Sequence, residues 1–314
     1  MSALAFTVMA LVLSGPVPGL LARATWPARA PRAAIVLWQA IALAAVLSAF
    51  SAGIAIASRL FEPGTDGRPT AYIFSEIDAL GWPLWTAYVL VFALTLVIGA
   101  RLALAVLQVA IATRRRRAHH RMVVDLVGKS RTCHHLPAAG YGLRILDVDQ
   151  PLAYCLPGVR SRVVVSEGTL TALADNEFAA IMSHERAHLR ARHDLVLEMF
   201  TAVHAAFPRL VRSASALGAV RLLIEMLADD AAVRAAGPTP LARALVACAG
   251  GHTPSGALAA GGPTTLLRVR RLAGRGNSLA LGMAAYLAAA AVLVVPTYAV
   301  ALPWLTELHR LFTA

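Results

Sequence analysis

The chain has 314 residues, of which 58% are hydrophobic and only 15% are charged. Soluble domains are about 45–50% apolar and about 25% charged, so this composition indicates a membrane protein. The formal net charge is +12. Basic loops beside membrane-spanning segments explain this excess, and we expect no direct binding to nucleic acid. The three cysteines, Cys133, Cys155 and Cys248, lack a metal-binding spacing and are expected to be structural.

Four apolar stretches are long enough to cross a bilayer, which takes about 20 residues. They are residues 3–22, 33–57, 82–100 and 279–302. No basic residue precedes the first stretch, so we interpret it as a retained helix and not as a secretory signal. The third stays largely apolar to residue 113. We expect its helix to leave the hydrocarbon near Arg101 and to continue as a stalk.

The loops between these stretches alternate in charge. The first loop and the segment after the third stretch are basic, with Arg23, Arg29, Arg32, Arg114, Arg115, Arg116, Arg117 and Arg121. The second loop is mainly acidic, with Glu62, Asp66, Glu76 and Asp78 against Arg59 and Arg68. Because Lys and Arg mark cytoplasmic loops, the pattern predicts that both termini lie outside the cell.

The chain is therefore expected to have three parts. Residues 1–113 hold three transmembrane helices with short loops, residues 114–278 form a cytoplasmic domain, and residues 279–314 hold a fourth transmembrane helix and a short tail. After a polar opening part, the domain is expected to have strands at 143–148, 153–156 and 163–165. Four helices should follow, at about 175–188, 194–207, 213–236 and after Pro240, and then a linker over 251–278.

His184, Glu185 and His188 form a His-Glu-x-x-His motif on the first of these helices. Residues four apart share one face of a helix, so both imidazoles can reach one Zn²⁺ ion. Zinc lowers the pKa of a bound water to about 7, and the glutamate can then act as general base. The motif also occurs by chance, so a third ligand has to come from elsewhere in the chain.

Glu225 and Asp229 are the candidates for that role. Glu225 is surrounded by apolar residues on its helix, where a charged carboxylate is unfavourable unless it is paired or bound to metal. As a ligand it completes a site of two histidines and one glutamate. Asp229, one turn further on, can hydrogen-bond a ligating histidine and fix its tautomer. The alternative is that Glu225 is an ion-pair partner of Arg221.

Other polar residues of the domain receive simpler interpretations. The paired histidines of its opening part are expected to be solvated and not to bind metal: His119, His120, His134 and His135. His193 and Asp194 are expected to begin the helix that follows the motif. Three arginines before the last span are expected to form a membrane-proximal basic patch: Arg268, Arg270 and Arg271.

Together, the two motif helices and the segments 153–158 and 163–168 resemble the BlaR/MecR family of integral-membrane zinc metallopeptidases. That family lies within the gluzincins, which include the Ste24 and HtpX proteases. The resemblance covers most of the chain. It implies a mainly α membrane protein of the bacterial cell membrane, with about four transmembrane helices and an inserted α+β gluzincin-type metalloprotease domain on the cytoplasmic side.

The resemblance also assigns roles to individual residues. It implies that Glu185 is the catalytic base and that three residues hold Zn²⁺: His184, His188 and Glu225. It further implies an edge strand that pairs with the backbone of a substrate, formed by Ala153, Tyr154, Cys155 and Leu156.

The function expected from these residues is hydrolysis of peptide bonds in cytoplasmic proteins. A BlaI-like transcriptional repressor is the substrate that the resemblance suggests, with the protein and the lipid bilayer as partners. Antirepressor members carry a penicillin-binding sensor domain after the last span, whereas this sequence ends at Ala314, so direct β-lactam sensing is not expected. Two alternatives stay open: a non-catalytic membrane signalling or scaffold protein with a structural zinc site, and a membrane quality-control protease.

Overall fold

The structure, a computed structural model, describes most of the chain. The described residues are 2–58, 62–63, 69–70, 77–78, 80–129, 142–158, 160–208, 213–249, 258–259, 264–274 and 276–313. Several residues discussed above lie outside them: Arg59, Asp66, Arg68, Glu76, Cys133, His134 and His135.

Among the described residues, four helical segments are long and apolar enough to cross a membrane, which confirms the predicted mainly α membrane architecture. They are Ala3–Arg23, Pro31–Ala57, Trp82–Val127 and Leu279–Thr306. In the first, α1 (Ser2–Ser14) and α2 (Pro16–Arg23) are separated at Gly15. The second and third are α3 (Pro31–Ala57) and α5 (Trp82–Val127). The last contains α12 (Leu279–Pro296), a π-helical turn η3 (Thr297–Ala301) and the start of α13 (Leu302–Thr313).

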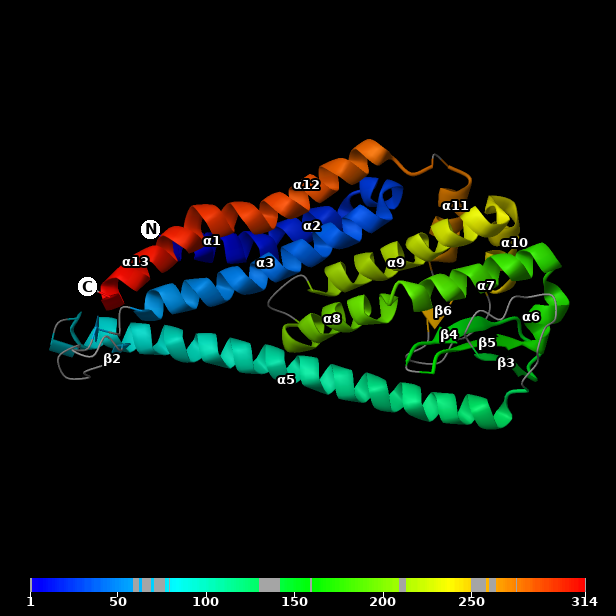
Figure 1. The fold of residues 1–314 in the computed structure, drawn as a ribbon, viewed down its shortest axis with the longest axis horizontal. Coiled ribbons are helices and arrows are strands. Elements are labelled where there is room, and N and C mark those ends of the chain that lie inside the picture. Colours follow the sequence, from blue (N-terminus) through cyan, green and yellow to red (C-terminus); the bar gives the residue numbers. More distant parts are fainter. Residues whose placement is uncertain are drawn as a thin grey trace.

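These helices form an elongated bundle at one end of the molecule. Figure 1 shows α1, α3 and α12 side by side, with α5 along the other side of α3. The two chain ends lie at the end of the bundle that is far from the sheet of the domain. The short helix η1 (Trp26–Arg29), which joins α2 to α3, lies at the opposite end. It is tied to the domain, because Nε of Arg271 donates to the carbonyl of Ala28 at 2.6 Å.

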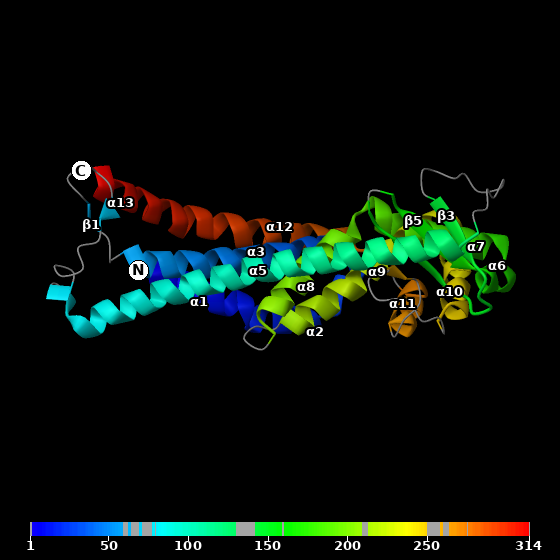
Figure 2. The same ribbon diagram turned by 90° about the horizontal axis from the view of Figure 1, so that it is seen from below.

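Helix α5 continues without a break from the bundle to the domain, as both ribbon views show (Figures 1 and 2). It has 46 residues, which correspond to about 69 Å at the usual rise per residue, against a hydrocarbon core of about 30 Å. The predicted stalk is therefore present, and the expected boundary at residue 113 falls inside this helix. Toward its C-terminal end, His119 is exposed, as expected for a solvated histidine. His120 is partly buried, and its Nε2 lies 3.0 Å from the Tyr154 hydroxyl.

The domain contains a small mixed sheet. Its strands are β3 (Gly142–Leu146), β4 (Ala153–Leu156), β5 (Arg162–Ser166) and β6 (Leu258–Ala259), in the order β3-β5-β4-β6. β3 and β5 are parallel, and β4 is antiparallel to both β5 and β6. A separate two-stranded pair, β1 (Glu62–Pro63) and β2 (Pro69–Thr70), lies in the loop between α3 and α5.

The prediction that Ala153, Tyr154, Cys155 and Leu156 form an edge strand is wrong. They form β4, but β6 pairs with its outer side at Tyr154 and Cys155. All four side chains are buried, and they alternate in the manner of a strand with both faces covered. Ala153 and Cys155 pack with the core under α7, while Tyr154 and Leu156 pack with Val124 of α5. Pattern alone did not reveal β6, because it comes from a segment about a hundred residues further along the chain.

Six helices in the described part of the domain complete it. They are α6 (Glu167–Ala172), α7 (Asp175–Arg190), α8 (His193–Ala206), α9 (Ser213–Ala236), α10 (Pro238–Ala247) and α11 (Thr265–Leu272). The helices predicted for this region are present, with ends within a few residues of the expected positions. The expected linker is wrong in one part, since residues 265–272 form α11 against α9 and α10.

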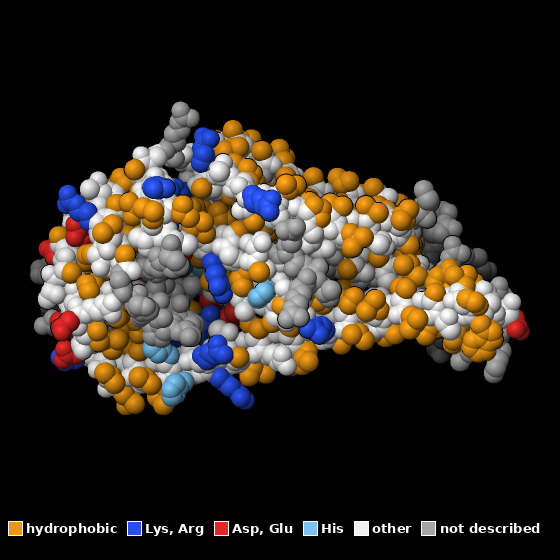
Figure 3. Space-filling model, turned by 180° about the vertical axis from the view of Figure 1, so that it is seen from behind, with side chains coloured by type: hydrophobic (Ala, Val, Ile, Leu, Met, Phe, Trp, Pro, Cys, Tyr) orange, Lys and Arg blue, Asp and Glu red, His pale blue; other side chains and the backbone are white. Residues whose placement is uncertain are grey.

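The domain rests directly on the membrane helices. Trp38 of α3 packs edge-on against Phe200 of α8, with ring centroids 6.5 Å apart, and both belong to one core cluster with Val220 and Ile224 of α9. Figure 3 shows how the composition of the surface changes along the molecule. Hydrophobic side chains dominate the membrane bundle, and Lys and Arg gather where the bundle meets the domain.

Small residues allow α3 and α5 to approach closely. A methyl group at Gly53 would overlap the side chain of Thr95, which is held by a 2.8 Å hydrogen bond to the carbonyl of Val91. We expect Gly53→Leu to destabilise the protein by about 1–3 kcal/mol through overpacking. Thermal unfolding of the purified protein in detergent would measure this. Gly282→Leu is the matched control, since a Cβ there meets no atom within 4 Å, and equal melting temperatures for the two variants would contradict the prediction.

Candidate metal centre

Helix α7 carries the His-Glu-x-x-His motif into the interior. Phe178, Ile181 and Met182 on this helix pack into the core that covers the sheet. The motif follows two residues later, with α9 packed along the other side of α7. His184, Glu185 and His188 are fully buried as a result. The helix is thus fixed by an apolar face on the sheet, while its motif faces α9.

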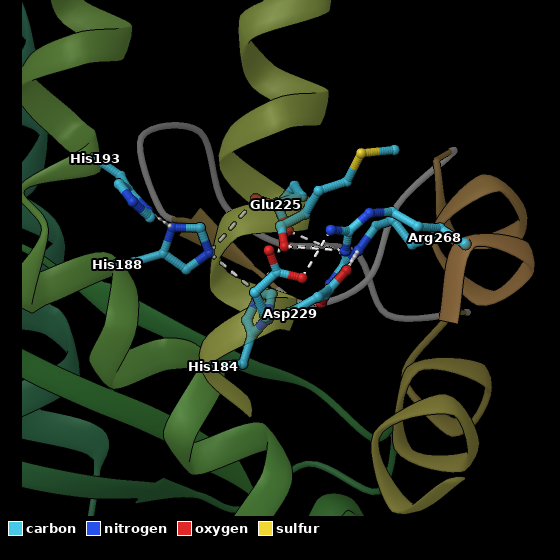
Figure 4. A network of polar contacts seen from close by, with 9 residues as sticks. His184, His188, His193, Glu225, Asp229 and Arg268 are labelled. Carbon is cyan, nitrogen blue, oxygen red and sulfur yellow. Dashed lines mark hydrogen bonds and ion pairs between the residues drawn. The ribbon is translucent and has the colours of Figure 1, made fainter. Parts of the chain in front are cut away.

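Glu225 of α9 meets the two histidines at the centre of this interface. Its carboxylate oxygens lie 3.4 Å from His184 Nε2 and 3.6 Å from His188 Nε2. The two Nε2 atoms are 3.1 Å apart. All three ligand atoms fall within 4.8 Å of one another, and Figure 4 shows the side chains converging on one point. The structure therefore brings together the three residues that the sequence suggests as metal ligands.

The spacing of these atoms fits a zinc ion. Ligand atoms about 2.0–2.2 Å from a tetrahedral ion lie about 3.3–3.6 Å apart, close to the distances given above. Two histidines and one carboxylate also form a donor set that Zn²⁺ accepts, with one coordination position left for water or substrate. The residues present could therefore hold zinc without rearrangement.

Glu185 lies beside this cluster in an unusual state for a carboxylate. It is fully buried, and among the described residues no nitrogen or oxygen donates a hydrogen bond to either of its carboxylate oxygens. Burial raises its pKa to about 7. The thiol of Cys155 on β4 is a neighbour, and its own pKa is raised well above the usual value, first by burial and then by the charge of Glu185. An unpaired buried carboxylate with a pKa near neutrality is typical of a general base.

Asp229 and Arg268 surround the cluster on the side away from the sheet. Asp229 Oδ1 lies 3.0 Å from His184 Nδ1. The guanidinium of Arg268 donates to both oxygens of Asp229, through Nε at 2.8 Å and through Nη2, and its Nη1 lies 3.1 Å from Glu225 Oε2 (Figure 4). Arg268 is only 1% exposed. One guanidinium thus holds the carboxylates of Glu225 and Asp229.

The electrostatics of these groups follow from their mutual contacts. Burial lowers the pKa of His184, but Asp229 and Glu225 outweigh this effect and raise it to about 9. Burial raises the pKa values of both carboxylates, yet the neighbouring imidazoles and Arg268 hold them below their usual values. Both carboxylates are therefore charged at neutral pH, as metal binding and ion pairing require.

His193 was not expected to take part in this site. It begins α8, and its Nδ1 lies 2.9 Å from Nδ1 of His188, behind the ring that faces Glu225 (Figure 4). Burial lowers the pKa values of both rings, to about 4 for His193 and about 3 for His188. A residue five positions after His188 would point about 140° away on a straight helix. The contact exists because Arg192 adopts a left-handed conformation, with φ of 50°, and turns the chain back.

The prediction of a basic patch is wrong for Arg268. Of the three arginines, Arg270 is exposed and Arg271 pairs with Asp230 at 2.8 Å, whereas Arg268 is buried in the centre. A signal for such a residue exists in the sequence, because two carboxylates on a buried helix require a nearby cation. It does not identify which of the 29 Lys and Arg residues supplies the charge.

The role of Arg268 can be tested by Arg268→Gln. Removing it leaves Asp229 buried without its counter-charge, which destabilises proteins by about 3–5 kcal/mol. Zinc affinity should fall by about 10–100-fold, because Asp229 and Glu225 lose their orientation. Thermal unfolding and competition with a zinc-binding dye would measure the two effects. Arg270→Gln on the same helix removes the same charge from an exposed position, and a similar loss in that control would refute the role.

Comparison with known proteins agrees with this centre. Residues 113–276, just over half of the chain, match the family model for Peptidase family M48. The matched region includes α7, α9 and α11, which carry the cluster. No curated protein and no solved structure matches the chain. The chain belongs to peptidase family M48, a family of metallopeptidases.

Proposed function

We propose that this protein is a membrane-embedded zinc endopeptidase that hydrolyses peptide bonds of cytoplasmic proteins. The observation that carries the proposal is the convergence of His184, His188 and Glu225 beside the unpaired, buried carboxylate of Glu185. A structural zinc site is closed by four protein ligands, whereas the described part of the chain brings three together here. A catalytic role therefore explains the arrangement better than a scaffold with structural zinc.

Zinc, when bound, supplies a Lewis acid that activates water and polarises the scissile carbonyl. Glu185 accepts a proton from the attacking water as the water oxygen bonds to the carbonyl carbon. The same carboxyl group then delivers the proton to the amine nitrogen as the C–N bond breaks. A pKa of about 7 allows Glu185 to act in both directions near neutral pH.

The other polar residues hold the ligands in place. A neutral ligating imidazole needs its lone pair on the nitrogen that faces the ion, so its other nitrogen carries the proton. For His184 that nitrogen faces Asp229, which can accept the hydrogen bond. For His188 it faces His193. Arg268 keeps Asp229 and Glu225 in register on α9.

A cytoplasmic orientation is part of the proposal. The basic loop that contains Arg29 and Arg32 lies at the end of the bundle that adjoins the domain, while both termini lie at the other end. Positively charged loops mark the cytoplasmic side, so the domain and this loop are expected there together.

For the natural substrate we propose a BlaI-like transcriptional repressor, on the basis of the resemblance of the motif helices and the β4–β5 segment to the BlaR/MecR family. β5 pairs with one side of β4 and β6 with the other. A substrate strand that pairs with β4 would therefore have to take the place of β6. Quality control of damaged membrane proteins is the second candidate, because it uses the same chemistry with a broader set of substrates.

Glu185→Gln and His188→Ala separate chemistry from metal binding. We expect Glu185→Gln to retain zinc and to lose at least about a hundredfold in proteolysis, because it lacks the proton acceptor. His188→Ala should lose both, because two ligands remain. Metal content and cleavage of an unfolded protein would be measured together. Asp175→Asn, an exposed acid on the same helix, should match the wild type, and a Glu185→Gln protein that still cleaves would disprove the mechanism.

The same variant can identify the substrate. Glu185→Gln is expected to retain bound substrates in native membranes, because binding is intact and hydrolysis is not. Crosslinking followed by mass spectrometry should enrich one repressor-like protein over the wild-type sample. Enrichment of many unrelated membrane proteins would instead identify quality control and refute a dedicated repressor.

A further inference from the structure

A cavity lies beside the metal centre, at the border between the domain and the membrane helices. It has a volume of about 460 Å³ and lies between the start of α3, the end of α7, the start of α8 and the middle of α9. Arg32, Arg190 and Arg234 line it. All three are exposed, and within the described part of the chain none of them forms an ion pair.

The lining of this cavity is positively charged and otherwise apolar. No Asp or Glu among the described residues lines it. Its walls include Val36 of α3 and Leu227 of α9. Three guanidinium groups converge on one space that contains no carboxylate, and guanidinium groups bind phosphate oxygens well. The missing counter-charge points to an anionic ligand.

His193 provides an independent observation for the same space. It is 3% exposed, it lines the cavity, and its Nε2 is buried without a hydrogen-bond partner in the described part of the chain. With a metal ion on Nε2 of His188, its Nδ1 carries the proton and can donate it to Nδ1 of His193, 2.9 Å away. A neutral His193 then carries its own proton on Nε2. A buried N–H without an acceptor requires one, and an anionic oxygen in the cavity would supply it.

A third feature is a separate apolar cavity in the membrane region. An apolar cavity of about 320 Å³ lies among α1, α3, α5 and α8, and its lining includes Trp38, Ile41, Phe200 and Leu102. Trp38 and Phe200 lie less than two turns further along the same two helices that line the charged cavity. The indole Nε1 of Trp38 is buried and has no hydrogen-bond partner among the described residues. An apolar cavity with one free donor at its side suits an acyl chain with its ester group.

We propose that an anionic phospholipid binds here, with its phosphate among Arg32, Arg190, Arg234 and the Nε2–H of His193 and its acyl chain along α3. Position favours a lipid over a soluble phosphate, because Arg32 is the second residue of the membrane-spanning helix Pro31–Ala57. Polybasic groups at this level attract the anionic lipids of the adjacent leaflet. Through His193 the headgroup would contact the residue that supports the metal ligand His188.

The test is lipid binding to the purified full-length protein, measured by native mass spectrometry. The probes are phosphatidylglycerol and phosphatidylcholine with identical chains. The wild type is expected to prefer phosphatidylglycerol by at least about tenfold, since each arginine contributes to the attraction. The variant Arg32→Gln/Arg190→Gln/Arg234→Gln should lose this preference. Ala231→Trp, which fills the cavity without changing its charge, should lower phosphatidylglycerol binding by a similar factor.

The control removes the same charge from elsewhere near the membrane. Arg114→Gln/Arg115→Gln/Arg116→Gln changes three exposed arginines of α5 and should keep the preference. Equal losses in the two triple variants would show general electrostatic attraction and would overturn the site. Binding of sn-glycerol 3-phosphate as tight as that of the lipid would assign the site to a free phosphate and would overturn it as well. Thermal unfolding of each variant identifies any that is misfolded. If the variant Arg32→Gln/Arg190→Gln/Arg234→Gln is misfolded, phosphatidylglycerol binding to Ala231→Trp decides whether the site exists.

Discussion

The position of Glu225, which is largely buried, and of Asp229, which is fully buried, on one helix against two imidazoles is the constraint on which the domain depends. Neither carboxylate can stay charged in an apolar interface without cations around it. The required cations come from different segments: the histidines of α7, an ion that they can hold, and Arg268 of α11. The polar centre therefore joins three helices that are far apart in sequence. The same contacts that make the site chemically competent also determine how the helices pack.

The sequence predicted the parts of this fold that depend on local pattern. The four apolar segments, the helix with His184 and His188, and the helix with Glu225 follow from helical periodicity and from the absence of charge. Three features could not be read in this way. Arg268 is one of many arginines, β6 pairs with a strand about a hundred residues away, and His193 reaches His188 only because Arg192 reverses the chain. Each of these depends on contacts between distant segments or on a single unusual backbone angle. The periodic spacing of apolar residues in the sequence carries information about neither.

The domain and the membrane bundle share their packing surfaces. Helices α8 and α9 contact α3 through one apolar cluster that contains Trp38, Phe200 and Ile224. Ile224 is next to Glu225 in sequence, so the wall of the metal centre on that side is also the wall against the membrane helix. A separation of the protein into an independent soluble peptidase and an anchor would expose this cluster to water. The membrane part is thus a structural component of the active domain.

The uninterrupted course of α5 has a mechanical consequence. Its N-terminal half lies in the bundle, and its C-terminal half contacts the peptidase domain. There Arg117 pairs with Asp194 and Glu198, and His120 lies against Tyr154 of β4. Helices that span a bilayer tilt when its thickness changes. A rigid rod of about 69 Å converts a tilt of a few degrees at one end into a displacement of several ångströms at the other. Thinning or thickening of the bilayer would therefore act as a lever on α8 and β4, the two elements that border His188 and Glu185.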